Sequence, residues 1–136
     1  MDRTDRPPVP AVVAIVAGAI GTIALATVWH WSGLVTRPSE RSYPLTQYFL
    51  NCVSWPFVIA YAAVALVIGR LARTEWPVAI GMVLPLPIAL VVEMIRDSTG
   101  HNLLGIEIAL YWVPALAIAY LGARARRVID RFRRSD

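Results

Sequence analysis

Four long apolar runs constrain the fold of this chain more than any other feature. Each holds about 20 residues, and short stretches rich in charged or turn-forming residues separate them. A helix needs about 20 apolar residues to cross the hydrocarbon core of a bilayer, where it satisfies its own backbone polar groups. We therefore predict four transmembrane helices, over residues 10–31, 48–69, 76–95 and 102–122.

The composition agrees with this interpretation. Of the 136 residues, 57% are hydrophobic and only 16% are charged, with a mean hydropathy of +0.58. Soluble domains carry about 25% charged residues. We predict one integral membrane domain over residues 1–136, an all-α four-helix transmembrane bundle followed by a basic tail at 123–136. The N-terminal run is too long for a signal peptide, so we expect it to remain as a helix.

The arginines predict the orientation of the bundle. All thirteen basic residues are arginine; ten lie in the N-terminus, the second loop and the C-terminal tail, and three lie in the other two loops. Positive charge favours the cytoplasmic side of a membrane. We therefore expect a multi-pass protein of the cytoplasmic membrane with both termini inside. A nucleic-acid partner is excluded, because no recognition motif accompanies the charges.

The basic tail is predicted to continue the fourth helix. Val128, Ile129 and Phe132 form an apolar strip among its arginines. Such a strip can lie on anionic lipid headgroups. The alternative is a tail that only anchors the topology.

Small residues and prolines predict how the helices pack. Ala14, Ala17, Gly18 and Gly21 place small side chains on adjoining turns of the first helix, which permits close helix contact in lipid. Prolines lie inside the other predicted helices, where they either open a cavity by kinking or are simply tolerated. They are Pro56, Pro85, Pro87 and Pro114.

The predicted outer turn between the third and fourth helices is the candidate site. Its carboxylates, imidazole, amide and phenol predict a binding site for a polar ligand or a cation. The residues are Glu93, Asp97, His101, Asn102, Glu107 and Tyr111. A metal would use Glu93, Asp97, His101 and Glu107. The alternative is an ordinary cap, because Asp, Ser, Thr, Gly and Asn are common turn residues.

Two of these carboxylates carry the prediction. Glu93 and Asp97 lie near the C-terminal end of the third helix, where the helix dipole disfavours negative charge. Arg96, His101, a bound cation or protonation of Glu93 would have to compensate. We expect Glu93 and Glu107 to face one another at similar depth beneath the turn.

Two further residues receive structural interpretations. His30, between Trp29 and Trp31, is expected to face lipid headgroups, with membership of the outer site as the alternative. Cys52 is expected to pack as a small apolar residue in the second helix.

The segment DSTGHNLLGIE, residues 97–107, resembles a D-x-T-x-H-N-L-x-x-x-E hairpin of small bacterial multi-pass membrane proteins. The resemblance covers eleven residues and implies a cluster of Asp97, His101, Asn102 and Glu107 at a helix–turn–helix. It implies no activity. Small multidrug transporters have a similar length, but they carry a glutamate in the first helix, where this chain has none.

Three functions follow as hypotheses. The first is a membrane protein that binds a polar ligand or cation in an outward-facing pocket, for transport or sensing. The second is an accessory or assembly subunit of a larger membrane complex, or a homo-oligomer. The third is a lipid-modifying enzyme, which ranks last because no nucleophile motif is present. No motif identifies a cofactor.

Overall fold

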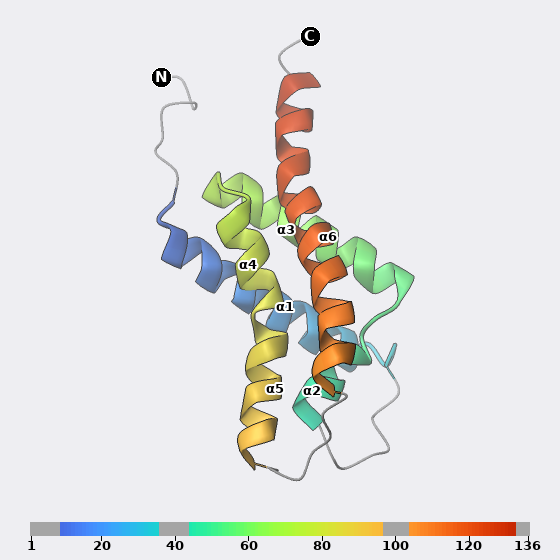
Figure 1. The fold of residues 1–136 in the computed structure, drawn as a ribbon. Coiled ribbons are helices and arrows are strands. Elements are labelled where there is room, and N and C mark those ends of the chain that lie inside the picture. Colours follow the sequence, from blue (N-terminus) through green and yellow to red (C-terminus); the bar gives the residue numbers. More distant parts are fainter. Residues whose placement is uncertain (1–8, 36–43, 97–103, 133–136) are drawn as a thin grey trace.

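The computed structural model describes residues 9–35, 44–96 and 104–132, and the side chains of all of these except 104–108. Every regular element among them is an α-helix. The helices are α1 (Ala11–Trp31), α2 (Pro44–Leu50), α3 (Trp55–Ala72), α4 (Trp76–Val83), α5 (Pro85–Arg96) and α6 (Leu104–Phe132) (Figure 1).

Three helical segments in the described residues are long and apolar enough to cross a membrane. They are Ala11–Trp31, Trp55–Ala72 and Trp76–Arg96, with mean hydropathies of 2.4, 1.8 and 2.3. The third consists of α4 and α5, which meet at Leu84 because Pro85 and Pro87 cannot donate backbone hydrogen bonds. The Leu84 N–H bonds the carbonyls of both Ile80 and Gly81, at 3.1 and 3.3 Å, as the helix tightens there.

The predicted helix over 48–69 is wrong in its bounds. The structure has α2 instead, then a break over residues 51–54, then α3. Ser54 caps α3 by accepting a hydrogen bond from the Phe57 N–H at 3.4 Å, and Pro56 occupies its first turn. Proline is well placed there, because first-turn amides have no partner within the helix. Pro56 therefore begins a helix and does not kink one, and Cys52 is buried in the break and not within a helix.

The long helices alternate in direction between two ends of the molecule. At one end α1 begins beside the end of α3, where the Val9 N–H donates to the Ala72 carbonyl at 3.1 Å. The same end holds the start of α4 and the last turns of α6, which extend beyond the other helices (Figure 1). We call it the arginine end. The opposite end, where α5 finishes and α2 lies, is the α2 end.

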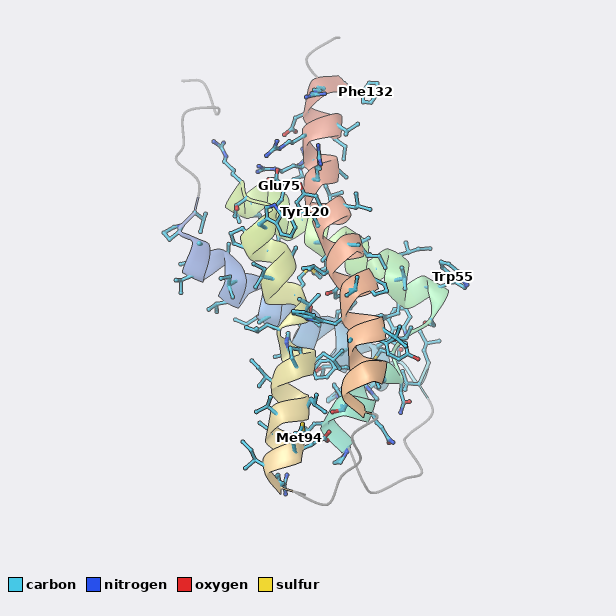
Figure 2. All side chains as sticks on the ribbon, viewed as in Figure 1. Trp55, Glu75, Met94, Tyr120 and Phe132 are labelled. Carbon is cyan, nitrogen blue, oxygen red and sulfur yellow. The ribbon has the colours of Figure 1, made fainter. Side chains whose placement is uncertain are left out.

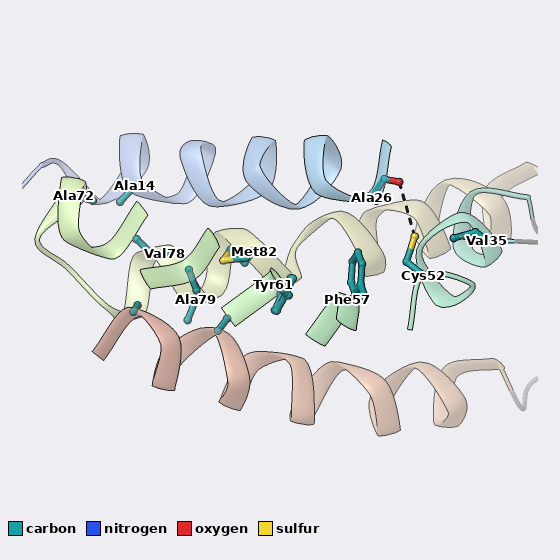
Figure 3. Packing of buried hydrophobic residues seen from close by; sticks show 13 residues of the cluster. Ala14, Ala26, Val35, Cys52, Phe57, Tyr61, Ala72, Val78, Ala79 and Met82 are labelled. Atoms are coloured by element: carbon teal, nitrogen blue, oxygen red, sulfur yellow. Dashed lines mark hydrogen bonds between the residues drawn. The ribbon is translucent and has the colours of Figure 1, made fainter. Parts of the chain in front are cut away.

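Small residues bring α1 and α4 into close contact. Ala14, Gly18, Thr22 and Ala26 recur every four residues and are buried along one side of α1. A Cβ atom added at Gly18 would lie 2.7 Å from the Val78 carbonyl oxygen. The predicted close approach is therefore confirmed at Gly18, where α1 and α4 run side by side in Figure 3. It is also confirmed at Gly21, where an added Cβ atom would lie 2.7 Å from Ile68 Cδ1 of α3.

Large apolar side chains point outward along the helices. Ile20, Ile59, Val67 and Val113 are each at least half exposed, and many others project from the ribbon in Figure 2. A soluble protein would leave such surfaces in water, whereas lipid tails cover them without cost. The structure is therefore that of a membrane-associated, all-helical protein. Helix α6 runs to Phe132, which confirms that the basic tail continues the last helix as far as the described residues reach.

Candidate functional site

The predicted hairpin site is described only in part. Asp97, His101 and Asn102 lie outside the described residues, and Glu107 lies in the first turns of α6 with its side chain outside them. Tyr111, one turn further along α6, is 46% exposed. The facing pair of Glu93 and Glu107 therefore stays a prediction.

Glu93 is described, and its carboxylate is fully engaged within the protein. The residue is only 4% exposed. Its Oε1 accepts hydrogen bonds from the backbone N–H groups of Leu45 and Thr46, the latter at 3.2 Å, and its Oε2 accepts from the Thr46 N–H and hydroxyl. These donors belong to the first turn of α2. Glu93 thus fastens the last turns of α5 to the start of the short helix.

This arrangement offsets the unfavourable interaction between the Glu93 carboxylate and the negative end of the α5 dipole. The first amides of a helix carry partial positive charge and have no partner within the helix. The carboxylate at the end of α5 therefore meets the positive terminus of α2. Of the compensating groups considered from sequence, Arg96 is exposed at the end of α5, and His101 lies outside the described residues.

His30 holds the other end of α2. Its Nε2 bonds the Tyr48 carbonyl oxygen at 2.8 Å, and its ring stacks on the Tyr48 ring with centroids 3.9 Å apart. The Tyr48 hydroxyl donates to the Thr27 hydroxyl oxygen at 3.1 Å. The His30 ring therefore packs against α2, a contact that the sequence did not predict, whereas its expected position among lipid headgroups stays a prediction. Glu93 and His30 together tie α2 to two long helices.

An apolar cavity of about 200 Å³ lies beneath α2. Residues from α1, α2, the break before α3, and helices α3 to α6 line it. Pro114 of α6 and Val83 and Leu86, on either side of the α4–α5 bend, are among them. The lining residues are Thr22, Phe49, Leu50, Val53, Phe57, Val58, Tyr61, Met82, Val83, Leu86, Tyr111, Trp112, Pro114, Ala115 and Ile118. The cavity is thus bounded by the proline-containing parts of two long segments.

Two hydroxyls lie deep in the cavity. The Thr22 hydroxyl donates to the Met82 carbonyl oxygen at 2.8 Å, and Tyr61 is only 6% exposed. Figure 3 shows Met82, Tyr61 and Phe57 between the long helices. The remaining deep lining is apolar, so the interior offers mainly apolar contact. Apolar cavities stay dry and accept apolar ligands.

Metal binding finds no support in the described part of the chain. No group of three or more His, Cys, Asp or Glu side chains there is close enough to hold an ion. Asp97, His101 and the side chain of Glu107 lie outside that part, so a metal site in the hairpin stays a prediction.

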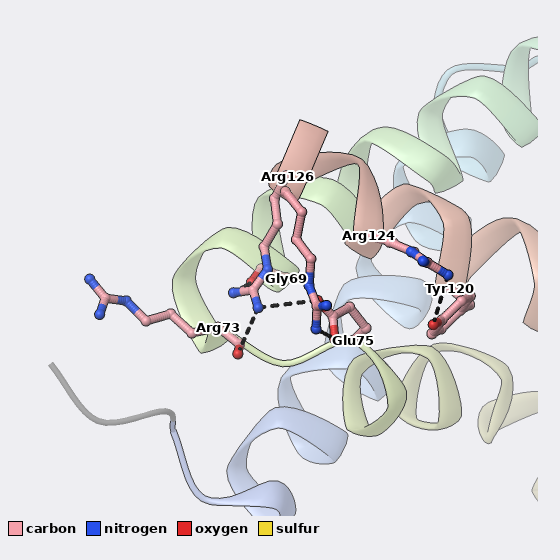
Figure 4. A network of polar contacts seen from close by, with 7 residues as sticks. Gly69, Arg73, Glu75, Tyr120, Arg124 and Arg126 are labelled. Atoms are coloured by element: carbon pink, nitrogen blue, oxygen red, sulfur yellow. Dashed lines mark hydrogen bonds and ion pairs between the residues drawn. The ribbon is translucent and has the colours of Figure 1, made fainter. Parts of the chain in front are cut away.

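A second polar cluster, which we did not predict, lies at the arginine end. Glu75, at the start of α4, is 8% exposed. Its Oε1 accepts from Arg127 Nε at 2.6 Å and Arg126 Nη2 at 3.2 Å, and its Oε2 accepts from Arg127 Nη2 at 2.8 Å. Arg126 also donates to the carbonyls of Gly69 and Arg73 at the end of α3, at 3.0 and 2.8 Å (Figure 4). The cluster joins α3, α4 and α6.

Two opposing effects act on the pKa of Glu75. Burial raises it, but the hydrogen bond from Arg127 and the charges of Arg126 and Arg127 outweigh burial, so the pKa lies below its ordinary value of 4.5. Glu75 is therefore ionised near neutral pH. A signal for this cluster existed in the sequence, because Glu75 is the only acid between Arg70, Arg73 and the third apolar run. Its partners, about 50 residues away, follow only from the packing of α6.

Comparisons with protein-family models, curated proteins and solved structures find no match to this chain. The proposals below therefore rest on its own geometry.

Proposed function

We propose that this chain is a four-span protein of the cytoplasmic membrane with both termini inside. The three apolar segments supply three spans, and the apolar part of α6, packed against α3 and α4, supplies the fourth. The alternating directions of the helices support an even number of crossings, since α1 begins and α6 finishes at the arginine end. Positive charge at that end favours the cytoplasmic side.

We further propose that the protein binds the acyl chain of a lipid in the cavity beneath α2. The observation that carries this proposal is the lining of the cavity, which is apolar apart from three hydroxyls and the Trp112 indole N–H, and in which the buried Thr22 hydroxyl is already hydrogen-bonded. An acyl chain needs no polar partner and is the most abundant apolar group around membrane helices. Its methylenes gain packing contacts with the cavity lining, although the bilayer has already removed them from water.

Photo-crosslinking tests this proposal. A fatty acid bearing a diazirine is added to the purified protein in neutral detergent, and the labelled peptides are mapped by mass spectrometry. We expect labels on Trp112 and Ile118, which line the cavity. Ala115→Trp fills the cavity and should reduce that labelling at least about tenfold, since a bulky ring excludes the chain.

Ala117→Trp is the matched control, because Ala117 is exposed on the same helix and does not line the cavity. This variant should label like the wild type. Labels confined to outward-facing residues such as Val113, or equal labelling of the two variants, would sink the proposal.

A second candidate function is binding of a polar ligand or cation at the hairpin formed by Glu93, Asp97, His101, Asn102, Glu107 and Tyr111. One observation favours it. Gln47 of α2 has a buried Oε1 atom that lacks a hydrogen-bond partner among the described residues, and a buried acceptor calls for a donor. In this candidate Glu93 positions α2, and the ligand contacts come from the turn.

Thermal unfolding with added divalent cations tests this candidate, because a ligand that binds only the folded state must stabilise it. We expect Mg²⁺, Ca²⁺ or Zn²⁺ to raise the unfolding midpoint of the wild type. Glu107→Gln and His101→Ala should lose that response. Identical responses from all three proteins would remove the basis for the candidate.

A further inference from the structure

The arginine end carries a large excess of positive charge. Its described segments, residues 69–75 and 120–132, hold six arginines and two carboxylates. The arginines are Arg70, Arg73, Arg124, Arg126, Arg127 and Arg131, and the carboxylates are Glu75 and Asp130. A local excess of four positive charges attracts anions over a distance of about 10 Å at moderate ionic strength.

These arginines differ in how far they are buried and in what they contact. Arg126 is turned inward, with a side chain only 13% exposed, and donates to Glu75 and to two carbonyls of α3. Arg70 pairs with Asp130 at 3.6 Å on the surface. Arg124, Arg127 and Arg131 are exposed instead. Inward-facing Arg126 holds the fold, so it is not available to a partner.

The three exposed arginines share one face of α6. Their spacing of three and four residues places them on successive turns, and we call them the arginine stripe. Arg127 uses Nε and Nη2 on Glu75, which leaves Nη1 as a further donor. Arginine is the side chain best suited to phosphate, because its planar fork can donate two hydrogen bonds to one group.

An aromatic ring lies on the same face of α6, one turn before the arginine stripe. Tyr120 packs against Trp76 with ring centroids 4.5 Å apart, and Arg124 lies over the Tyr120 ring at 5.8 Å (Figure 4). Tryptophan and tyrosine concentrate where the hydrocarbon core meets the headgroups. The order along α6 is therefore aromatic layer first and arginine stripe next, which matches the change from acyl chains to phosphates in a lipid leaflet.

We infer that the arginine stripe, Arg124, Arg127 and Arg131, is a docking surface for the phosphate headgroups of anionic phospholipids. The surface goes beyond the cavity proposed above and does not depend on it. Tyr120 and Trp76 set its depth, and Arg126 and Glu75 hold α6 so that the stripe faces the leaflet. The bound partner is a lipid and not free phosphate, because the stripe continues the face of the aromatic layer.

The test measures lipid binding by the full-length protein in micelles of a neutral detergent. Phosphatidylglycerol and phosphatidylcholine are titrated separately, and the apparent Kd is followed by thermophoresis. We expect phosphatidylglycerol to bind more tightly, with an affinity that falls as salt is added. Arg124→Gln/Arg131→Gln avoids the Glu75 cluster and should weaken phosphatidylglycerol binding about 25-fold, at about fivefold per charge.

Arg96→Gln is the matched control, because Arg96 is exposed at the α2 end and the change in charge per residue is the same. It should alter the Kd by less than about twofold. Circular dichroism confirms that each variant is folded, and Arg131→Gln alone replaces the double variant if that one unfolds. Equal binding of both lipids, an equal effect of Arg96→Gln, or stripe-dependent binding of inorganic phosphate alone would overturn the inference.

Discussion

Two buried carboxylates, Glu75 and Glu93, are satisfied in different ways at opposite ends of the molecule. Glu75 is 8% exposed and is held by two guanidinium groups, whereas Glu93 is 4% exposed and is held by backbone amides and a hydroxyl. Figure 2 shows Glu75 at one end of the bundle and Met94, next to Glu93, at the other. Each carboxylate joins segments far apart in the sequence.

The difference shows two solutions to the same physical problem. A carboxylate near a membrane is costly unless hydrogen bonds or opposite charges replace its water. At the arginine end, full charges also fix α6 against α3 and α4. At the α2 end, neutral donors suffice because the dipole of a short helix points at Glu93. Removing each carboxylate therefore has different consequences.

The largest effect is expected for Glu75→Gln, which leaves Arg126 buried without its counter-charge. Removing one partner of a buried ion pair costs about 3–5 kcal/mol, and the half-exposed Arg127 places this case at the lower end. We expect the free energy of unfolding in mixed micelles to fall by about 3 kcal/mol. Asp130→Asn, in the exposed pair with Arg70, should cost less than about 1 kcal/mol. Equal losses in the two variants would contradict the structural role of Glu75.

The loss of stability at low pH gives a further test of Glu75→Gln against Asp130→Asn. Because the pKa of Glu75 is lower in the folded protein than its ordinary value of 4.5, the folded state binds the proton less readily than the unfolded state. This contribution to stability is complete above that value and is lost as pH falls through the lowered pKa. Thermal unfolding from about pH 6 to about pH 3 should show this loss in the wild type and in Asp130→Asn. If Glu75→Gln shows an unchanged acid response, the arginine contacts do not stabilise the carboxylate.

A smaller effect is expected for Glu93→Gln, because this change leaves no buried charge behind. The amide keeps one acceptor oxygen but turns an NH₂ group toward donors of α2. Buried donors without acceptors cost about 1–3 kcal/mol, so we expect a loss of about 2 kcal/mol in the free energy of unfolding. Thr46→Val removes only the hydroxyl donor and should cost about 1 kcal/mol. Hydrogen exchange should increase at the amides of α2 in Glu93→Gln.

The double variant completes this comparison. Because Glu93 and Thr46 are direct partners, the two changes should cost less together than the sum of the separate losses. Additive losses would mean that the contact between Glu93 and the Thr46 hydroxyl contributes nothing to stability. A larger loss for Glu93→Gln than for Glu75→Gln would reverse the comparison between charged and neutral partners.

The predicted helix bounds are correct where one apolar run corresponds to one helical segment. The first prediction, 10–31, matches α1 within a residue, and the third, 76–95, matches the bent segment of α4 and α5. The second failed because the break over 51–54 is too short to interrupt an apolar run. Ser54 followed by Pro56 is a helix-start signal that could have located α3. The extension of α6 was predictable, since its last residues contain no helix breaker.

The candidate site was predictable only as a set of residue types. The position of Glu93 at the end of a helix follows from the sequence, as does its need for a compensating group. Its partner does not, because Thr46 is 47 residues away and belongs to a helix absent from the prediction. The cavity likewise depends on how Pro114 and the bend at Leu84 face one another across two segments.

By itself, then, the sequence determined that the chain is helical and apolar, where most of the helices lie, and where positive charge collects. These properties are local, because helix formation and lipid compatibility depend on neighbouring residues. Only the tertiary structure decided which donors reach Glu75 and Glu93, that His30 holds α2, and that a cavity lies beneath that helix. Those features depend on contacts between distant segments, and the apolar pattern of a membrane helix does not specify which neighbour each face meets.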